Sequence, residues 1–273
     1  MINLTPKHAF NIPVDAENIA PDVFAGKSVT EIKSLYIWEG NCRRVLDDLF
    51  TVECKEEPNN EDLVIRILGD LTKVKRLGAR MSLGQIAVNG SVGMRLGEEM
   101  KGGVITVMGN ADSWAGMMMK GGTIEVAGNV GDYLGASYRG STDGMKGGTI
   151  MVHGDAGNEV GCYMNKGMIR INGNTGQFAG MHMSDGTILI MGNAGERVGA
   201  QMIGGKIILL GTVPSILPSF NIDSIRKSVR IDQDKVKGPF YLFKGDYTES
   251  YSGSLYVVTA KNPQLKIYET KIL

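Results

Sequence analysis

The amino-acid sequence predicts an all-β fold, a single-stranded parallel β-helix solenoid of about eight coils with a 19-residue repeat and capping segments at both ends. Three observations predict this fold class. The unit G-x-x-M-x-x-G-x-I-x-V-x-G recurs, with small changes, seven times between Gly78 and Gly211; each unit carries two alternating inward positions; and a turn-forming residue follows its last glycine. The expected domains are an N-terminal cap (1–62), the repeat domain (63–211) and a C-terminal capping and docking segment (212–273).

The methionines of the repeat define its period, because they are 19 residues apart except for 26 between Met119 and Met145. An unbranched thioether can fill irregular space at a corner, so this column is predicted to be core. It consists of Met81, Met100, Met119, Met145, Met164, Met183 and Met202.

Two mostly β-branched residues precede the final glycine of each repeat and alternate with an outward residue, a period of two that predicts one stacked strand per coil. Eight strands about 4.8 Å apart would extend over roughly 35 Å. The inward pairs are Ile65/Ile67, Ile86/Val88, Ile105/Val107, Ile124/Val126, Ile150/Val152, Ile169/Ile171, Ile188/Ile190 and Ile207/Leu209.

The residue after the final glycine is Asp, Asn or Ser in seven repeats, types that hydrogen-bond locally in turns. Each strand is therefore expected to end in a Gly-Asx corner. Two further small or apolar columns follow, beginning with Val92 and Leu96, and these are also expected to face inward.

One coil carries seven extra residues within ASYRGSTDG, and an insertion into a stacked repeat must loop outward. The 136–142 loop is either a partner contact, which Tyr138 and Arg139 favour, or a tolerated surface excursion. Trp114, Tyr133 and Phe178 share one outward column, and exposed aromatic residues are enriched at interfaces.

The outward strand positions change from polar in early repeats to apolar in late ones, such as Leu189 and Ile208. Something must cover that late face, and we expect the C-terminal segment of this chain to do so in preference to a partner. Both flanks are interpreted as caps that also dock partners, because the edges of a stacked sheet aggregate unless they are covered.

Composition excludes several functional classes. Lys plus Arg and Asp plus Glu both total 29, so no net charge attracts nucleic acid or an anionic membrane, and neither is expected as a partner. Three widely spaced cysteines indicate neither a disulfide framework nor a zinc site, and the sequence lacks a signal-peptide pattern or a membrane-spanning run. A cytoplasmic location is expected.

A search for chemistry finds no paired carboxylates, nucleophile with a base, or metal cluster, so we expect no catalytic, cofactor-binding or metal residues in this chain. His8, His153 and His182 lack metal-ligand spacing and are interpreted as structural. Cys162 has no evident base, and AGKS (25–28) lacks the first glycine of a phosphate loop. Lys101, Lys120 and Lys146 form a column that either binds an anion or aids solubility.

The repeat and its flanks resemble the C subunit of formylmethanofuran dehydrogenase over essentially the whole chain. The most specific stretches are ENIAPDVFAGKS (17–28), the seven repeat units and GDYLGASYRG (131–140); the fourth unit departs from the pattern with Thr142 in place of its first glycine. The repeat is also similar to the C-terminal domain of the glutamate synthase large subunit and to the C subunit of the bacterial formyltransferase/hydrolase complex.

The resemblance implies a non-catalytic scaffold subunit in an oxidoreductase complex of methanogenesis, found in the cytoplasm of anaerobic archaea, which reversibly reduces CO2 with a ferredoxin-type partner and attaches it as formyl to methanofuran. Tungsten or molybdenum pterin, iron-sulfur clusters and a binuclear zinc site would all lie in other subunits. The implied partners are an amidohydrolase-like subunit, pterin-binding redox subunits and iron-sulfur subunits.

Two alternatives stay open. The same scaffold could serve a formyltransferase/hydrolase complex without CO2 reduction, or the chain could be a self-contained acyltransferase-like enzyme. His153, in an outward strand position beside a corner, is the candidate base for the second alternative.

Overall fold

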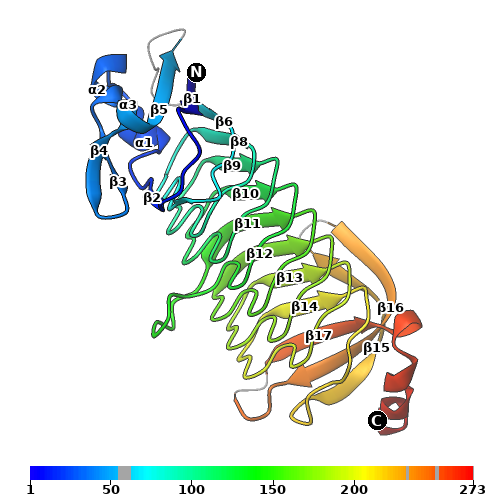
Figure 1. Cartoon of the computed structure of the whole chain (residues 1–273). Coiled ribbons are helices and arrows are strands. Elements are labelled where there is room, and N and C mark those ends of the chain that lie inside the picture. Colours follow the sequence, from blue (N-terminus) through cyan, green and yellow to red (C-terminus); the bar gives the residue numbers. More distant parts are fainter. Residues whose placement is uncertain (55–62, 232–233, 250–251, 273) are drawn as a thin grey trace.

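A computed structural model describes residues 1–54, 63–231, 234–249 and 252–272. Its main feature is a 13-stranded sheet with the strand order β15-β16-β17-β14-β13-β12-β11-β10-β9-β8-β6-β1-β5. A second sheet has the order β4-β3-β2-β7. The N-terminal elements lie at one end of the long sheet and the C-terminal elements at the other (Figure 1).

The repeats form a ladder of eight parallel strands in register, so that each residue pairs with its equivalent in the next repeat, as Ile105 does with Ile124. The second and fourth residues before each final glycine face inward and are at most 1% exposed, which confirms the predicted strand columns. The strands are β6 (Val64–Leu68), β8 (Gln85–Asn89), β9 (Val104–Val107), β10 (Thr123–Val126), β11 (Lys146–Val152), β12 (Lys166–Ile171), β13 (Thr187–Ile190) and β14 (Lys206–Leu209).

The predicted fold class, a single-stranded parallel β-helix solenoid, is wrong. The strands form one mostly parallel 13-stranded sheet that continues into antiparallel pairs at both ends, with one strand in each repeat from Gln85 to Leu209. On the other sides of the described repeats the chain runs through turns, and single-residue bridges replace strands from Leu71 to Thr175. Frequent left-handed backbone in these segments interrupts extended pairing.

The methionine column is buried, at 0% exposure in all seven repeats, as predicted. In six of the seven repeats the thioether methyl extends toward the next repeat, where it meets a glycine with positive φ, whereas the methyl of Met202 meets Gly253. A Cβ added at Gly103, for example, would lie 2.5 Å from Met81 Cε, and φ at that glycine is +79°. The paired Met and Gly columns are therefore one packing device, in which the missing Cβ makes room for the methionine of the preceding repeat.

The residues of the Gly-Asx corners form a ladder of their own. Each side-chain oxygen accepts a hydrogen bond from the backbone N–H of the equivalent residue one repeat later, as Asn174 Oδ1 does from Asn193 N at 2.8 Å. Six such bonds, of 2.7 to 3.0 Å, connect Ser91, Asn110, Asn129, Asp155, Asn174, Asn193 and Thr212. The corner column thus stabilises the stacking of repeats as well as the turn within each one.

The N-terminal segment closes one end of the sheet. Strand β1 pairs with β6 in parallel and with β5 in antiparallel fashion, and β2 joins β7, which belongs to the first repeat. Helix α2 begins with a capping box between Ser28 and Glu31. The elements are β1 (Ile2–Pro6), β2 (Val14–Asp15), α1 (Pro21–Phe24), α2 (Val29–Lys33), β3 (Tyr36–Glu39), β4 (Cys42–Val45), α3 (Leu46–Leu49), β5 (Phe50–Cys54) and β7 (Val74–Lys75).

An ion cluster attaches the N-terminal segment to the repeats. The Arg76 guanidinium lies 3.3 Å from Asp15 Oδ2 and 3.2 Å from Glu98 Oε2, and it also pairs with Glu17. Burial lowers the pKa of Arg76, but the three carboxylates outweigh this effect and raise it overall. The cluster therefore links two N-terminal carboxylates to side chains of the first two repeats.

The C-terminal segment closes the other end. Strand β17 (Gly253–Val258) pairs with β14, and β16 (Asp234–Gly245) and β15 (Asn221–Ile231) continue the sheet; 3-10 helices η1 (Thr259–Lys261) and η2 (Pro263–Lys271) follow. Leu189 and Ile208, on the outer face of the ladder, pack in one cluster with Val229, Ile231 and Phe240 of β15 and β16. The expectation that the chain covers its own apolar late face is confirmed. No helix among the described residues is long and apolar enough to cross a membrane.

Candidate interaction surfaces

Each of the three histidines makes local contacts within the structure. His8 packs edge-on against Phe10, and His182 stacks on Tyr163 with ring centroids 4.4 Å apart. His153 Nε2 lies 2.7 Å from Glu125 Oε1, and its Nδ1 lies 3.2 Å from Asn172 Nδ2. No cluster of three or more potential metal ligands occurs among the described residues.

Cys162 is a poor nucleophile. This residue is 5% exposed, and burial, with a smaller contribution from the Glu159 carboxylate, raises the pKa of the thiol to about 12. Since the thiolate is the reactive form, almost none exists near neutral pH. The structure therefore does not favour Cys162 as a catalytic residue.

The lysine column is partly neutralised. Lys120 Nζ lies 2.9 Å from Glu99 Oε2, and Lys146 Nζ lies 3.0 Å from Asp143 Oδ1. Two of the three cations thus already have carboxylate partners, which weakens the interpretation of the column as an anion site.

Two surface columns run along the repeats with left-handed backbone, a feature that the sequence did not indicate; the second consists of Arg80, Glu99, Met118, Tyr163, His182 and Gln201. In the first, φ lies between +57° and +64° for residues that are aromatic or charged. It consists of Arg76, Arg95, Trp114, Tyr133, Glu159, Phe178 and Arg197. The predicted aromatic column is part of it, and its three aromatic residues are half-buried.

The 136–142 loop is held against this column. Arg95 Cζ lies 5.1 Å from the Tyr138 ring centroid, and Arg139 Cζ lies 5.5 Å from that of Trp114 and 5.8 Å from that of Tyr133. The rings of Trp114 and Tyr133 are stacked, with centroids 4.5 Å apart. Three cation–π contacts, one from Arg95 and two from Arg139, thus hold the loop against the repeats.

A pocket of about 220 Å³ lies between the loop and the repeats; we call it the insertion pocket. Aromatic rings, one cation and one carboxylate line it above the buried Cys162. Its main lining residues are Tyr133, Tyr138, Arg139, Glu159, Cys162 and Tyr163. Sequence analysis singled out Tyr138, Arg139, Tyr133 and Cys162 separately but missed Glu159 and Tyr163. The charged Glu159 in an otherwise aromatic or arginine column was the available signal.

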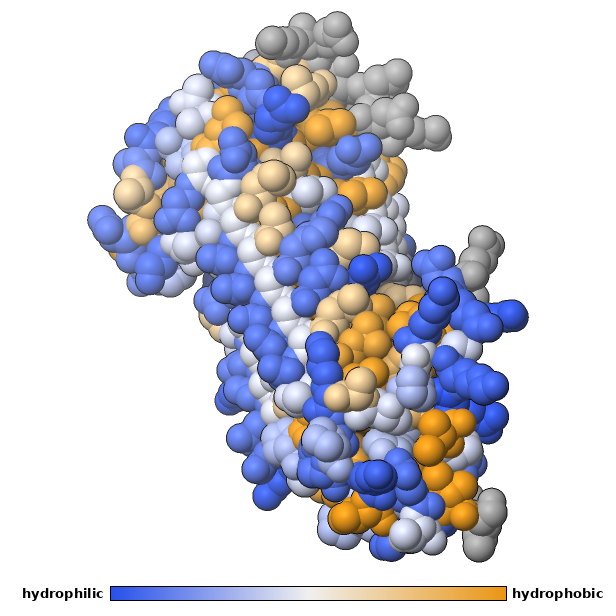
Figure 2. All heavy atoms as spheres, turned by 90° about the vertical axis from the view of Figure 1, so that its right-hand side faces the viewer, coloured by the Kyte–Doolittle hydropathy of each residue, from blue (hydrophilic) through white to orange (hydrophobic). Residues whose placement is uncertain are grey.

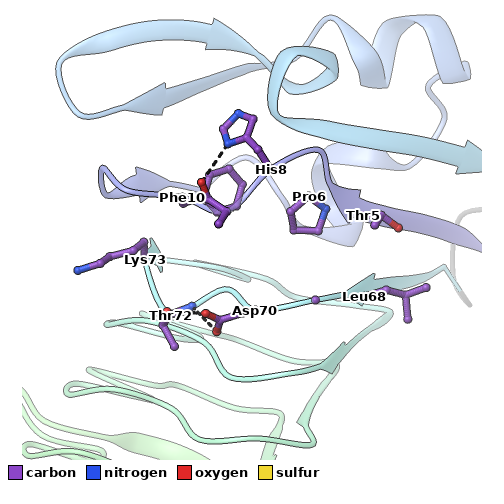
Figure 3. A pocket seen from close by; sticks show the side chains of 10 residues that line it. Thr5, Pro6, His8, Phe10, Leu68, Asp70, Thr72 and Lys73 are labelled. Carbon is purple, nitrogen blue, oxygen red and sulfur yellow. Dashed lines mark hydrogen bonds between the residues drawn. The ribbon is translucent and has the colours of Figure 1, made fainter.

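A second pocket, of about 400 Å³, opens where β1 leaves β6. Pairing of these strands ends at Leu4 and Ile67, and Pro6, which lacks an N–H group, cannot extend it. Figure 3 shows the N-terminal residues His8 and Phe10 on one side and Lys73 and Asp70 on the other. The Asp70 carboxylate already accepts hydrogen bonds from Thr72 N and Oγ1.

An apolar groove of about 280 Å³, which we call the hairpin groove, remains between the outer face of the ladder and the β15–β16 hairpin. Its lining includes Met151, Met168, Leu189, Met191, Leu210, Ile231 and Val236. Figure 2 shows a hydrophobic area on the face of the molecule that bears the C-terminal strands. Flexible methionine side chains adapt to varied partners, so this groove is the second candidate contact surface.

Comparisons with known proteins agree on one family. A family model described as "GXGXG motif" matches residues 85–238, more than half of the chain. The C subunit of molybdenum-containing formylmethanofuran dehydrogenase 1 from Methanothermobacter marburgensis is 45% identical over 92 residues, which are 34% of this chain and 22% of that protein. The C subunit of tungsten-containing formylmethanofuran dehydrogenase 2 from Methanothermobacter wolfeii is 46% identical over 93 residues, 34% of each chain.

The aligned part thus spans about a fifth to a third of the curated relatives' length. A chain of the formyltransferase/hydrolase complex from Methylorubrum extorquens, solved in complex with methylofuran, superposes over 94% of this chain and 99% of its own, with a TM-score of 0.81 and 29% identity. The resemblance to the formylmethanofuran dehydrogenase C subunit found in the sequence is confirmed.

Proposed function

This chain belongs to the GXGXG motif family, and we propose that it is the non-catalytic scaffold subunit of a formylmethanofuran dehydrogenase complex. The observation that carries the proposal is the identity of 45% and 46% to the C subunits of both the molybdenum and the tungsten enzyme.

In this proposal the complex reduces CO2 reversibly and attaches the product as a formyl group to methanofuran. Tungsten or molybdenum pterin, iron-sulfur clusters and a zinc pair supply that chemistry from other subunits. The present chain holds those subunits in place, since its in-register strands enclose a fully buried, close-packed interior.

The contact surfaces in this proposal are the 136–142 loop with its insertion pocket, the hairpin groove, and the segments 1–62 and 212–273 at the two ends. We propose that an amidohydrolase-like subunit, pterin-binding redox subunits and iron-sulfur subunits use them, in the cytoplasm. Aromatic and methionine side chains at two of these surfaces support the assignment, because both types are enriched at interfaces.

A second candidate is the scaffold subunit of a formyltransferase/hydrolase complex. The likeness to a chain of that complex over 94% of this chain favours it. Neither candidate requires chemistry in the present chain, so the partners distinguish them.

The test is purification of the native complex without oxygen, followed by mass spectrometry and metal analysis. Redox subunits with iron and either tungsten or molybdenum are the expected result. Partners without these metals would assign the chain to a formyltransferase/hydrolase complex in place of a dehydrogenase complex. A homogeneous oligomer of this chain that is active alone would refute both, and a loss of that activity in His153→Ala would then identify the catalytic base.

A further inference from the structure

The insertion pocket contains a carboxylate that forms no ion pair with the described residues, although Arg139 also lines the pocket. Glu159 is half-buried, and in the described part of the chain no lysine or arginine nitrogen lies within 4.0 Å of its carboxylate. Burial of a charge costs free energy unless the charge is paired. The arrangement therefore leaves a half-buried negative group for which the described residues provide no ion-pair partner within 4.0 Å.

Two tyrosine rings beside this carboxylate each have an unstacked face. Tyr133 stacks on Trp114 of the preceding repeat, whereas Tyr163 stacks on His182 of the following one. The stacked faces point in opposite directions along the ladder, and both rings line the pocket. The electron-rich face of a tyrosine attracts a cation.

Arg139 does not fill this position. Its Cζ atom is almost equidistant, at 5.5 and 5.8 Å, from the centroids of the stacked Trp114 and Tyr133 rings. A guanidinium on the outer face of Tyr133 would be much farther from Trp114, since the two centroids are themselves 4.5 Å apart. Arg139 therefore does not lie on the outer face of Tyr133.

The charge of Glu159 acts inside the pocket. Burial is the main reason that the pKa of the Cys162 thiol is raised to about 12, and the Glu159 carboxylate adds to it. Because the thiol lines the same pocket, a cation entering there would be attracted by Glu159 in a site that is partly shielded from water, an attraction that Arg139, also in the lining, opposes.

We propose that the insertion pocket receives a lysine or arginine side chain of a partner protein, held between the free faces of Tyr133 and Tyr163 and paired with Glu159. This inference rests on the proposed scaffold function. With a volume of about 220 Å³ the pocket is smaller than the roughly 300–1,000 Å³ of typical small-molecule sites, and it fits a single long side chain. The 136–142 loop then forms one wall of a docking site.

The test uses the tagged full-length chain, expressed in its native host and purified with whatever subunits it retains. The variants are Glu159→Gln, which removes the charge, and Glu159→Lys, which reverses it. Glu196→Gln is the matched control, because Glu196 is exposed and, within the described residues, has no ion pair. All three keep a Cβ at the substituted position, so the left-handed backbone at residue 159, with φ of +57°, is no more strained than before.

We expect Glu159→Gln to weaken partner retention about tenfold at low salt and Glu159→Lys to weaken it further, with unchanged melting temperatures and no effect of Glu196→Gln. A photo-crosslinker at Tyr138 should join partner peptides that contain lysine or arginine. Retention equal to that of the unchanged chain in both Glu159 variants would overturn the inference. Loss of partners in Arg139→Ala alone would also overturn it, in favour of an acidic partner group.

The two proposals fail in different ways. If the unchanged chain retains no other subunit, the scaffold function and the pocket assignment are both refuted. If it retains subunits that respond to neither Glu159 variant, only the pocket assignment is refuted.

Discussion

Asn193 offers a direct test of whether the corner ladder stabilises the stacked repeats. Its Oδ1 accepts a hydrogen bond of 2.9 Å from Thr212 N, and its own N–H donates to Asn174 Oδ1. Asn193→Ala removes the acceptor for Thr212 but leaves the donor of residue 193 in place. Asn193→Asp is the matched control, because a carboxylate keeps the acceptor and neither neighbour in the ladder is acidic.

The expected loss of stability in Asn193→Ala is that of one hydrogen bond. Both residues are exposed, so water can replace the lost acceptor and the net cost should be about 1 kcal/mol. In a protein of this size about 1 kcal/mol lowers the melting temperature by roughly 2–4 °C. The six bonds together would contribute about 6 kcal/mol, a large share of the stability of an ordinary domain.

The assay is thermal unfolding followed by circular dichroism, with urea unfolding as a second measurement. Asn193→Ala should melt about 2–4 °C below the unchanged chain, and Asn193→Asp close to it. Equal melting temperatures for the Ala variant and the unchanged chain would show that the corner hydrogen bonds do not stabilise the stacked repeats. An equal fall in both variants would assign the effect to the carboxamide nitrogen, against the proposed role of the oxygen.

Three further outcomes are expected. Iodoacetamide at pH 8 should label the exposed Cys42 and leave Cys162 unmodified. The pKa of the Cys162 thiol, about 12, leaves about 1 in 10,000 of these groups ionised at that pH. Equal labelling of both cysteines, measured by mass spectrometry, would contradict this prediction. Asp246→Asn should lower the melting temperature at pH 7, and the difference from the unchanged chain should shrink below about pH 4. Burial opposes ionisation of Asp246, but hydrogen bonds to its carboxylate lower the pKa overall. The stabilisation by this carboxylate therefore disappears as it is protonated. Ile208→Ala should cost about 2–5 kcal/mol in urea unfolding and Ile225→Ala, at an exposed position, much less; similar losses would refute the covered face.

The buried columns were predictable because hydrophobic alternation reports directly which residues face inward. Ile105 and Val107 are strand residues, and Met100 is core, as their positions in the repeat indicate. The fold class was not predictable in the same way. Alternation describes one strand, and it cannot tell whether the remaining sides of a repeat pair as strands or pass through turns.

The columns of left-handed backbone explain why the observed fold differs from the predicted fold class. Thirteen described residues other than glycine have positive φ, among them Trp114, Tyr133 and Glu159. Aromatic and charged residues rarely adopt this conformation, so the residue types at these positions did not predict it. Where it occurs in every repeat, the backbone cannot stay extended, and pairing contracts to single bridges.

The contact surfaces were only partly predictable. The seven-residue insertion in the repeat located the 136–142 loop, and the apolar late positions located the face that β15 and β16 cover. Glu159 was missed because its significance depends on neighbours from three repeats. Which faces of Tyr133 and Tyr163 are free follows from their stacking partners, and stacking is a property of three-dimensional structure.

The in-register ladder has a consequence for how proteins of this kind can change length. Val104 pairs with Thr123, its equivalent one repeat later, so removal of residues 104–122 would join two positions that have the same neighbours in every column. The distance between the two terminal segments can therefore change only in whole steps of one strand spacing, about 4.8 Å each. Subunits bound at opposite ends would be set at discrete separations, and an insertion of any other size must leave the ladder as a loop, as residues 136–142 do.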